Sequence, residues 1–373
     1  MNHGPLDLTG KLRQVGVQPA LAALARGQSP SAPIVVELDP TSFCDLACPE
    51  CISSPLLNKA RFTRDRLTTL AEELAAVGVR AVILIGGGEP LLHPATPQVI
   101  KTLAEADVQV GLTTNGTTID RCLDVLAEKV TWTRVSVDAA SSSTSARFRP
   151  ARSGGAKFEQ VVANMRLLAG RKRGKLGFSY LLMSRRDMAG RVVESNFDEV
   201  ESAARLAADI GCDYFEVKPE YDMGHYIIAQ DEKLVGQLHE QLGRIDALQS
   251  ETFAVLKPNN LDVVLSGGPT TQLKEYDWCP TLELRTLLTP SGAYVCPYHR
   301  GNARARYGDP TNTDFNTLWR GPQRREALRR IDPRTDCEFH CIRHESNLEL
   351  LRISGAGMPM LAPVDQTDED LFI

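Results

Sequence analysis

The strongest constraint on the fold is an alternation of apolar strands and helices through the middle of the chain. Six strands are predicted, at residues 33–38, 81–85, 108–112, 134–138, 176–183 and 213–218. Helical stretches separate them, near residues 67–77, 96–106, 118–128, 157–169 and 196–209. Such alternation predicts a parallel sheet with right-handed crossovers. A doubly wound sheet and a partial barrel both satisfy it, and periodicity alone does not choose between them.

Length and composition fit an α/β protein of ordinary character. The chain has 373 residues, of which 42% are hydrophobic and 24% charged, enough for one large domain with an appendage. The net charge of -5 argues against a nucleic-acid partner, which favours a basic surface. No apolar run approaches the ~20 residues of a membrane span, and no signal-peptide core is present. We therefore expect a cytoplasmic protein with neither nucleic acid nor membrane as a partner.

The cysteines are grouped in a way that suggests metal sites. One group, directly after the first strand, comprises Cys44, Cys48 and Cys51. A second group, in the C-terminal third, comprises Cys279, Cys296, Cys337 and Cys341, and two cysteines stand apart, Cys122 and Cys212. Without an export signal, structural disulfides are the less favoured interpretation. Structural zinc needs four protein ligands, so three thiolates leave one position open unless a distant residue such as His93 completes the set.

Polar residues follow the predicted strands, where parallel sheets carry their active sites. Gly86-Gly-Gly-Glu-Pro90 follows the second strand and Asn115 the third, while the fourth ends in Ser136-Val-Asp138. The sixth strand presents Glu216 and Lys218 on one face. Charged residues on an interior strand are costly to bury unless they meet each other or a ligand. Substrate contact is the favoured role of this pair, and structural ion pairing is the alternative.

The Cys44-x3-Cys48-x2-Cys51 spacing, followed by Gly86-Gly-Gly-Glu-Pro90 after the next strand, resembles the signature of the radical S-adenosylmethionine (SAM) superfamily. The resemblance extends through Val135-Ser-Val-Asp138 and covers roughly residues 34–220. It implies a partial (β/α)6 TIM-like barrel, which chooses between the two arrangements above. The residue before the last motif cysteine is often apolar or aromatic in this superfamily, whereas here it is Glu50.

The resemblance also implies cofactors. Three thiolates would hold a [4Fe-4S] cluster whose free iron binds SAM, and SAM cleavage would give a 5′-deoxyadenosyl radical that abstracts hydrogen. The implied SAM-binding residues are Gly86, Gly87, Gly88, Glu89, Asn115, Ser136 and Asp138. Glu89 is the candidate acceptor for the methionine ammonium, and backbone oxygens are the competing candidates. Asn115, Ser136 and Asp138 are candidate contacts to the ribose and carboxylate of SAM, and a simple capping role is the alternative. A one-electron reductant of flavodoxin or ferredoxin type is the implied partner.

The second cysteine group resembles the auxiliary-cluster region called SPASM or, in its shorter form, twitch. Cys279 and Cys296 flank a predicted hairpin with Gly292 at its turn, and Cys337 and Cys341 close the site. Tyr307-Gly-Asp309 and Leu318-Trp319 match the stretch between them, although three residues rather than the usual four separate Gly292 from Cys296. The resemblance implies one auxiliary [4Fe-4S] cluster, fully ligated and therefore suited to electron transfer. Structural zinc is the alternative.

The expected domain order follows from these assignments. It is an N-terminal extension (1–33), a radical SAM partial barrel (34–221), a connecting or lid segment (222–278), a small α+β twitch domain (279–347) and a C-terminal tail (348–373) whose acidic end is frayed. Further helices are expected near residues 232–248 and 317–331.

The expected activity is hydrogen abstraction from a small polar natural-product intermediate, such as a sugar, aminocyclitol or nucleoside. Only about 33 residues precede the first strand, which disfavours a leader-binding domain. Neither Cys122 nor Cys212 is expected to lie where it could return a hydrogen atom. Oxidation of an alcohol to a ketone is therefore favoured, with the auxiliary cluster as electron acceptor. Redox-neutral epimerisation, peptide maturation and a zinc-stabilised binding protein are the alternatives.

The candidate catalytic residues lie in two places. Lys218, Glu216 and Glu220 belong to the sixth strand, and Tyr298, His299 and Arg300 follow Cys296. A lysine held between acids can titrate near neutral pH and accept a proton. His299 could equally be a packed neighbour of the auxiliary cluster.

Overall fold

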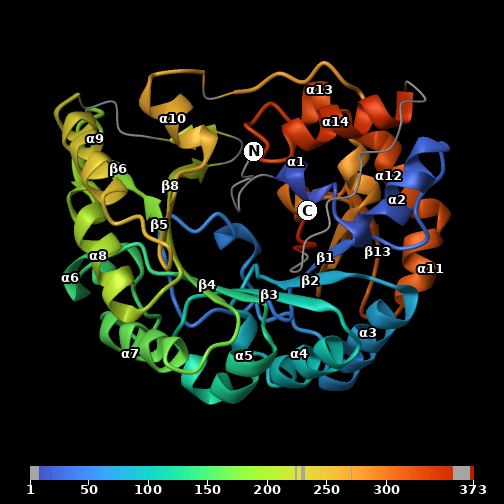
Figure 1. The fold of residues 1–373 in the computed structure, drawn as a ribbon, viewed down its shortest axis with the longest axis horizontal. Helices are drawn as coiled ribbons and strands as arrows, with labels where there is room; N and C mark the ends of the chain where they lie inside the picture. The colour runs from blue at the N-terminus through green and yellow to red at the C-terminus, as the bar shows by residue number, and fades with distance from the viewer. Residues whose placement is uncertain (1–7, 223–224, 228–231, 270, 356–369) are drawn as a thin grey trace. The chain divides into compact units, whose positions relative to one another are not determined.

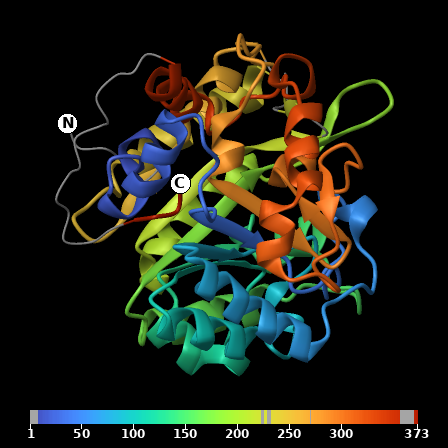
Figure 2. The same ribbon diagram turned by 90° about the vertical axis from the view of Figure 1, so that its right-hand side faces the viewer.

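The structure is a computed structural model that describes residues 8–222, 225–227, 232–269, 271–355 and 370–373 (Figures 1 and 2). The chain forms two compact units. The first unit comprises Met1–Phe43, Asn58–Gly111 and Gln272–Ile373, and the second comprises Cys44–Leu57 and Leu112–Thr271. This division differs from the linear domain order expected above, because the C-terminal third packs with the first strands of the chain.

In the first unit, the strands follow the order β2–β1–β11–β12–β13. β1 (Val35–Leu38) pairs in parallel with β2 (Ala81–Leu84) on one side and with β11 (Arg285–Thr289) on the other. β12 (Gly292–Tyr294) and β13 (Arg306–Gly308) continue the sheet in antiparallel pairing. The hairpin predicted around Gly292 is therefore present, and its first strand is added directly to the first strand of the chain.

The main helices of the first unit have clear end signals. α3 (Arg64–Val77) begins at Thr63, whose hydroxyl accepts a hydrogen bond from the Arg66 backbone, and ends at Gly78, which has a φ of 94°. It packs against α4 (Thr96–Glu105) and α11 (Phe315–Arg320). The single helix expected at 317–331 is instead two, because Gly321 is extended before Pro322, where α12 (Pro322–Arg330) starts.

Described residues near both ends of the chain pack together in the first unit. α1 (Leu8–Lys11) and α2 (Gln18–Ala25) pack against α14 (His344–Gly355). The short helix α13 (Pro333–Asp336) comes before α14 in the chain and lies near it (Figure 1). The expected fraying of the acidic end is wrong for residues 370–373. Leu371, Phe372 and Ile373 are buried, and Lys11 pairs with Asp370 at 2.9 Å. The apolar Leu-Phe-Ile sequence explains the burial, since it removes three large side chains from water.

The second unit continues the parallel arrangement. β3 (Gln109–Thr114) leads the chain into it, and β4 (Trp132–Ser136), β5 (Lys175–Leu182), β8 (Tyr214–Asp222) and β10 (Ala254–Leu256) pair in parallel in that order. β9 (His225–Ile227) is antiparallel to β8. All six predicted strands are thus present, as β1, β2, β3, β4, β5 and β8. β10 was not predicted, and lies in the segment expected to be a connection or lid.

Helices separate the strands of the second unit. They are α5 (Leu123–Lys129), α6 (Ser142–Phe148), α7 (Phe158–Ala169), α8 (Val200–Ile210), α9 (Glu232–Asp246) and α10 (Asn259–Leu265). A small hairpin, β6 (Ser184–Arg186) with β7 (Val192–Ser195), follows β5. Among the described residues no helix has the length and apolar character needed to cross a membrane. The expected cytoplasmic location stays a prediction.

Candidate active site

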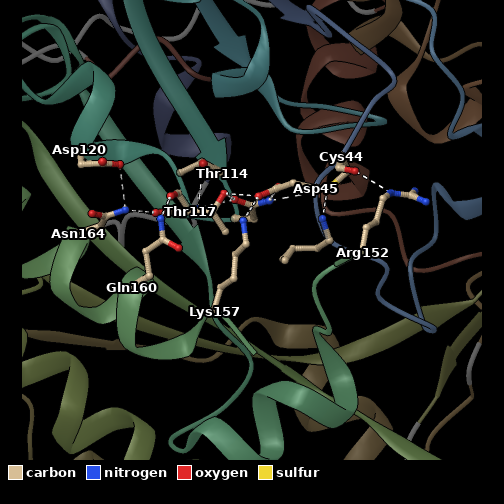
Figure 3. A network of polar contacts seen from close by, with 12 residues as sticks. Cys44, Asp45, Thr114, Thr117, Asp120, Arg152, Lys157, Gln160 and Asn164 are labelled. Atoms are coloured by element: carbon tan, nitrogen blue, oxygen red, sulfur yellow. Dashed lines mark hydrogen bonds and ion pairs between the residues drawn. The ribbon is translucent and has the colours of Figure 1, made fainter. Parts of the chain in front are cut away.

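The loop that carries Cys44, Cys48 and Cys51 is held within the second unit through Asp45 (Figure 3). The Asp45 carboxylate accepts hydrogen bonds from Asn115 (2.8 Å), the Thr117 hydroxyl (2.8 Å) and the Lys157 ammonium (3.0 Å). Although burial opposes ionisation, these three donors lower the pKa of Asp45. Asp45 is therefore an ionised anchor one residue from the first motif cysteine, and sequence reasoning did not identify it.

Two further contacts fix Cys44 itself. The Asn115 side-chain amide lies 3.7 Å from the Cys44 sulfur, and the Leu46 backbone N–H donates to the same sulfur at 3.4 Å. Arg152 donates to the Cys44 carbonyl oxygen at 2.8 Å. Asn115 thus positions the cysteine loop in this structure, while its predicted contact with SAM stays a prediction.

Helix α7 supports the segment after β3 that supplies Asn115 and Thr117 (Figure 3). Gln160 donates to the Thr117 carbonyl oxygen at 2.8 Å, and Asn164 donates to the Gly116 carbonyl oxygen at 2.9 Å. Lys157 stands at the N-cap of the same helix. The start of α7 therefore fixes both the loop after β3 and, through Lys157, the cysteine loop.

Glu50, which departs from the superfamily pattern, has a clear partner. Arg185 on β6 forms an ion pair with Glu50. It also pairs with Glu194 on β7 at 2.6 Å. The Arg185 guanidinium also lies over the Phe148 ring, 4.7 Å from its centroid. Glu50 therefore ties the end of the cysteine loop to the β6–β7 hairpin, which is why a charged residue is accommodated there.

Asp138 and Arg149 form a partly buried ion pair near the cysteines. Arg149 Nη1 lies 2.6 Å from Asp138 Oδ2, while Asp138 Oδ1 accepts from the Leu181 backbone at 2.7 Å. Against the effect of burial, the negative charges of Cys48 and Asp138 raise the pKa of Arg149. Arg149 also borders a small cavity together with Asn115 and Ser136. Three predicted site residues, Asn115, Ser136 and Asp138, thus lie around Arg149, which was not predicted from the sequence.

The glycine segment belongs to the first unit and requires glycine at two positions. A Cβ on Gly88 would lie 2.2 Å from the Phe43 carbonyl oxygen, and one on Gly86 would lie 2.2 Å from the Gly88 oxygen. The Glu89 backbone N–H donates to Phe43 at 2.8 Å, and the buried Glu89 side chain accepts from the Leu91 backbone at 3.0 Å. Glu89 therefore caps the turn that follows, and its contact with a methionine ammonium stays a prediction.

Lys218 lies in a charged cluster on β8. Its ammonium is 3.1 Å from Glu216, which also pairs with Arg134 on β4 at 3.3 Å. Burial and the Arg134 charge lower the pKa of Lys218. Burial alone would raise the pKa of Glu216, but Lys218 and Arg134 lower it to about 2. Glu220 is buried on the same face of the strand.

The second cysteine group is gathered within the first unit. Burial and the other cysteines, Cys341 first, raise the pKa of Cys279 to about 12, and burial raises that of Cys296 to about 11. Burial and the same set of thiols also raise the pKa of Cys337. The charge of one thiolate therefore disfavours ionisation of another thiol within this set. Such a set gains most from a positively charged inorganic centre that all of them can bind.

The residues expected to face the substrate from the hairpin have other neighbours in this structure. His299 Nε2 lies 3.4 Å from the Cys337 sulfur, and the Tyr298 ring packs on Phe339 with centroids 4.5 Å apart. Burial lowers the pKa of His299. Arg300 forms an ion pair with the buried Asp39. His299 is thus a neighbour of the auxiliary cysteines, as one of its two interpretations had it.

His93, the residue considered as a fourth zinc ligand, has other partners in this structure. Both His93 ring nitrogens are used locally, with Nε2 at 2.9 Å from the Phe62 oxygen and Nδ1 accepting from Ala95 at 3.2 Å. No three potential ligands in the described part of the chain converge tightly enough to hold a single metal ion. What supports a cluster is the donor set, namely three thiols beside a buried arginine and a separate set of four thiols.

Part of this chain matches a known protein family. The family model described as "Radical SAM superfamily" matches residues 38–185, which include all three motif cysteines and the glycine segment. Residues 38–185 therefore form a radical SAM domain. A [4Fe-4S] cluster that binds SAM is therefore the cofactor that Cys44, Cys48 and Cys51 would hold.

Two curated relatives are similar in sequence over part of their length. The AdoMet-dependent heme synthase of Methanosarcina barkeri (strain Fusaro / DSM 804) is 26% identical over 191 residues, 50% of this chain and 50% of the relative. The GTP 3',8-cyclase of Chlorobaculum tepidum is 38% identical over 98 residues, 25% of this chain and 29% of the relative. The chain thus spans half of one relative and less than a third of the other.

Solved structures match more of the fold. Streptococcus suis SuiB bound to its precursor peptide SuiA has a TM-score of 0.60 at 13% identity, covering 84% of this chain and 70% of SuiB. anSMEcpe with bound AdoMet has a TM-score of 0.58 at 14% identity, covering 86% of this chain and 92% of anSMEcpe. The expected fold class, an α/β partial barrel, is confirmed. The C-terminal twitch domain stays a prediction.

Proposed function

We propose that this radical SAM enzyme oxidises an alcohol to a ketone on a small polar substrate of the sugar, aminocyclitol or nucleoside type. The SAM-bound cluster would supply a 5′-deoxyadenosyl radical, and an auxiliary [4Fe-4S] cluster held by Cys279, Cys296, Cys337 and Cys341 would supply an electron acceptor. The balance is simple. The carbinol carbon loses a hydrogen atom, its hydroxyl loses a proton, and one electron leaves, which yields the ketone.

The observation that carries the proposal is the Lys218 cluster. A proton acceptor for the substrate hydroxyl needs a neutral form at working pH, and the pKa of Lys218 is lowered by burial and by Arg134. Glu216, at 3.1 Å, orients the ammonium that forms. The Lys218 side chain keeps 28% of its surface exposed, so it can reach a ligand. In this proposal Lys218 is the base, Glu216 holds it, and Arg134 pairs with Glu216. Glu220 extends the polar face of β8.

The two cysteines outside the cluster groups favour oxidation over epimerisation. Epimerisation needs a thiol that returns a hydrogen atom to the opposite face of the substrate radical. Cys212 is 4% exposed, and burial raises its pKa to about 12. It precedes β8, at the amino end of that strand, whereas Lys218 lies at the middle of the strand. Cys122 is buried at the N-cap of α5. Neither position suits a hydrogen donor.

The proposed partner is a one-electron reductant of flavodoxin or ferredoxin type, and the proposed substrate is a free small molecule rather than a peptide. SuiB was solved with a precursor peptide, but at 13% identity its similarity concerns the fold alone. The charged character of the β8 face supports a ligand rich in hydroxyl and amine groups.

The test compares Lys218→Met with Lys172→Met in the reconstituted enzyme under anaerobic conditions. Lys172 pairs with Asp213 at 2.6 Å before β8 and serves as a control for loss of a partly buried lysine. Substrates are a panel of sugars, aminocyclitols and nucleosides, with products read by mass spectrometry. Lys218→Met should still form 5′-deoxyadenosine but should lose ketone formation by about a hundredfold or more. Wild-type turnover in Lys218→Met, or solvent deuterium incorporation without change in oxidation state, would contradict the proposal.

A further inference from the structure

Asp39 is a buried carboxylate that no sequence motif singled out. It directly follows β1, its side chain is 2% exposed, and its backbone N–H donates to the Leu288 carbonyl oxygen on β11 at 2.8 Å. Oδ2 accepts from the Gly87 backbone N–H at 2.9 Å and from Arg300. Asp39 therefore joins the ends of three strands of the first unit: its own, the neighbouring β2 through Gly87, and β11.

Burying the Asp39 carboxylate in this way costs folding free energy, which indicates that the residue has a role beyond stability. Asp39 Oδ1 is buried and has no hydrogen-bond partner among the described residues. A half-satisfied buried carboxylate is destabilising, and such groups concentrate at functional sites. The charge is retained because Arg300, which has 13% of its side chain exposed, compensates it.

Arg300 reaches Asp39 from the loop that carries an auxiliary cysteine. It lies four residues after Cys296, beyond the short helix Pro297–His299. Its Nη1 would be 3.2 Å from a Cβ placed on Gly87, so the guanidinium packs closely over that glycine. Both partners of the ion pair therefore contact Gly87, Asp39 through a hydrogen bond and Arg300 through packing.

We propose that Asp39 and Arg300 form a positioning pair that fixes the SAM-binding glycine segment from the hairpin that carries Cys296. The pair holds the Gly87 peptide in one orientation, and the chain beyond Cys296 is thereby coupled to SAM affinity. Arg300 is then a positioning residue rather than the substrate contact expected from the sequence. Because the pair acts on SAM binding, it is independent of the oxidation proposed above.

The test is a double-mutant cycle on SAM affinity, measured by equilibrium dialysis with radiolabelled SAM on the anaerobically reconstituted enzyme. Asp39→Ala should weaken SAM binding about ten- to hundredfold, as expected for loss of a charge-assisted hydrogen bond. Arg300→Met should weaken it in the same direction. The double variant should be no weaker than Asp39→Ala, because both residues act through one contact. Asp39→Asn, which keeps an acceptor for Gly87, should be weakened less than Asp39→Ala.

The matched control is Arg304→Met. Arg304 is in the same loop and pairs with Asp336, but its side chain is 56% exposed, so SAM affinity should stay at the wild-type value. Additive effects of Asp39→Ala and Arg300→Met, or wild-type affinity in Arg300→Met, would overturn the pair. Normal SAM binding in the wild type without ketone formation would instead contradict the proposed oxidation and leave the pair intact.

Discussion

Asp45→Ala is the perturbation that most directly tests how the cysteine loop is held. The substitution removes an acceptor for two neutral donors, Asn115 and Thr117, and for the Lys157 ammonium. A neutral hydrogen bond contributes about 0.5–1.5 kcal/mol and one to a charged group about 1.5–3 kcal/mol. Asp45 and Lys157 retain 17% and 30% of their side-chain exposure, so water replaces part of what is lost. We expect a loss of about 3 kcal/mol in the free energy of unfolding.

The assay is urea unfolding of the cluster-free protein followed by tryptophan fluorescence, together with hydrogen exchange of residues 44–57. Asp124→Ala is the matched control. It breaks the exposed ion pair between Asp124 and Arg171, whose side chains are 82% and 50% exposed. The free energy of unfolding should fall by less than about 1 kcal/mol. Faster exchange confined to the cysteine loop and the segment after β3 is expected for Asp45→Ala. Equal effects of the two substitutions would refute the assignment of Asp45 as the loop's anchor.

Two further predictions concern the glycine segment and Glu216. Gly88→Ala places a Cβ 2.2 Å from the Phe43 oxygen and should abolish SAM binding measured by equilibrium dialysis. The control Gly236→Ala, which has open space around the new Cβ, should leave SAM affinity unchanged. Equal SAM affinities of the two variants would contradict the close approach at Gly88. Glu216 has a pKa of about 2 in the folded protein, against an ordinary value of 4.5. Its ionised form therefore stabilises the fold by ~3 kcal/mol at pH values above 4.5. This contribution is lost as the pH falls toward 2. Urea unfolding between about pH 5 and pH 3 should therefore show a flatter pH dependence for Glu216→Gln than for the wild type, and parallel curves would argue against the shift.

The strands and the presence of the cysteine and glycine motifs were the parts most readily recognised from the sequence. Apolar runs such as Ala81–Leu84 and the stop at Gly78 are local signals, and both appear in the structure where expected. The cysteine and glycine motifs were recognisable because a cluster demands fixed residue types at short spacing. The division of the helix expected at 317–331 could also have been predicted from local sequence, because Pro322 restricts the backbone of Gly321.

The supporting residues could not be found in the same way. Arg149 meets Asp138 across 11 positions, Arg185 meets Glu50 across 135, and Arg300 meets Asp39 across 261. No periodic pattern specifies such pairs, because a lone charged residue in a loop is most often solvated. The burial of Leu371–Ile373 likewise depends on a distant surface. Long-range partners of this kind become visible only once the sheet places them together.

The measurement that tests the central claim most directly is an iron and sulfide count after anaerobic reconstitution. The wild type is compared with a Cys44/Cys48/Cys51 triple alanine variant and a Cys279/Cys296/Cys337/Cys341 quadruple alanine variant. Two cubane sites predict about eight irons in the wild type and about four in each variant. A wild type with about four irons, a quadruple variant with the same number and a triple variant with none would contradict the auxiliary cluster. The proposed oxidation would then lack its electron acceptor.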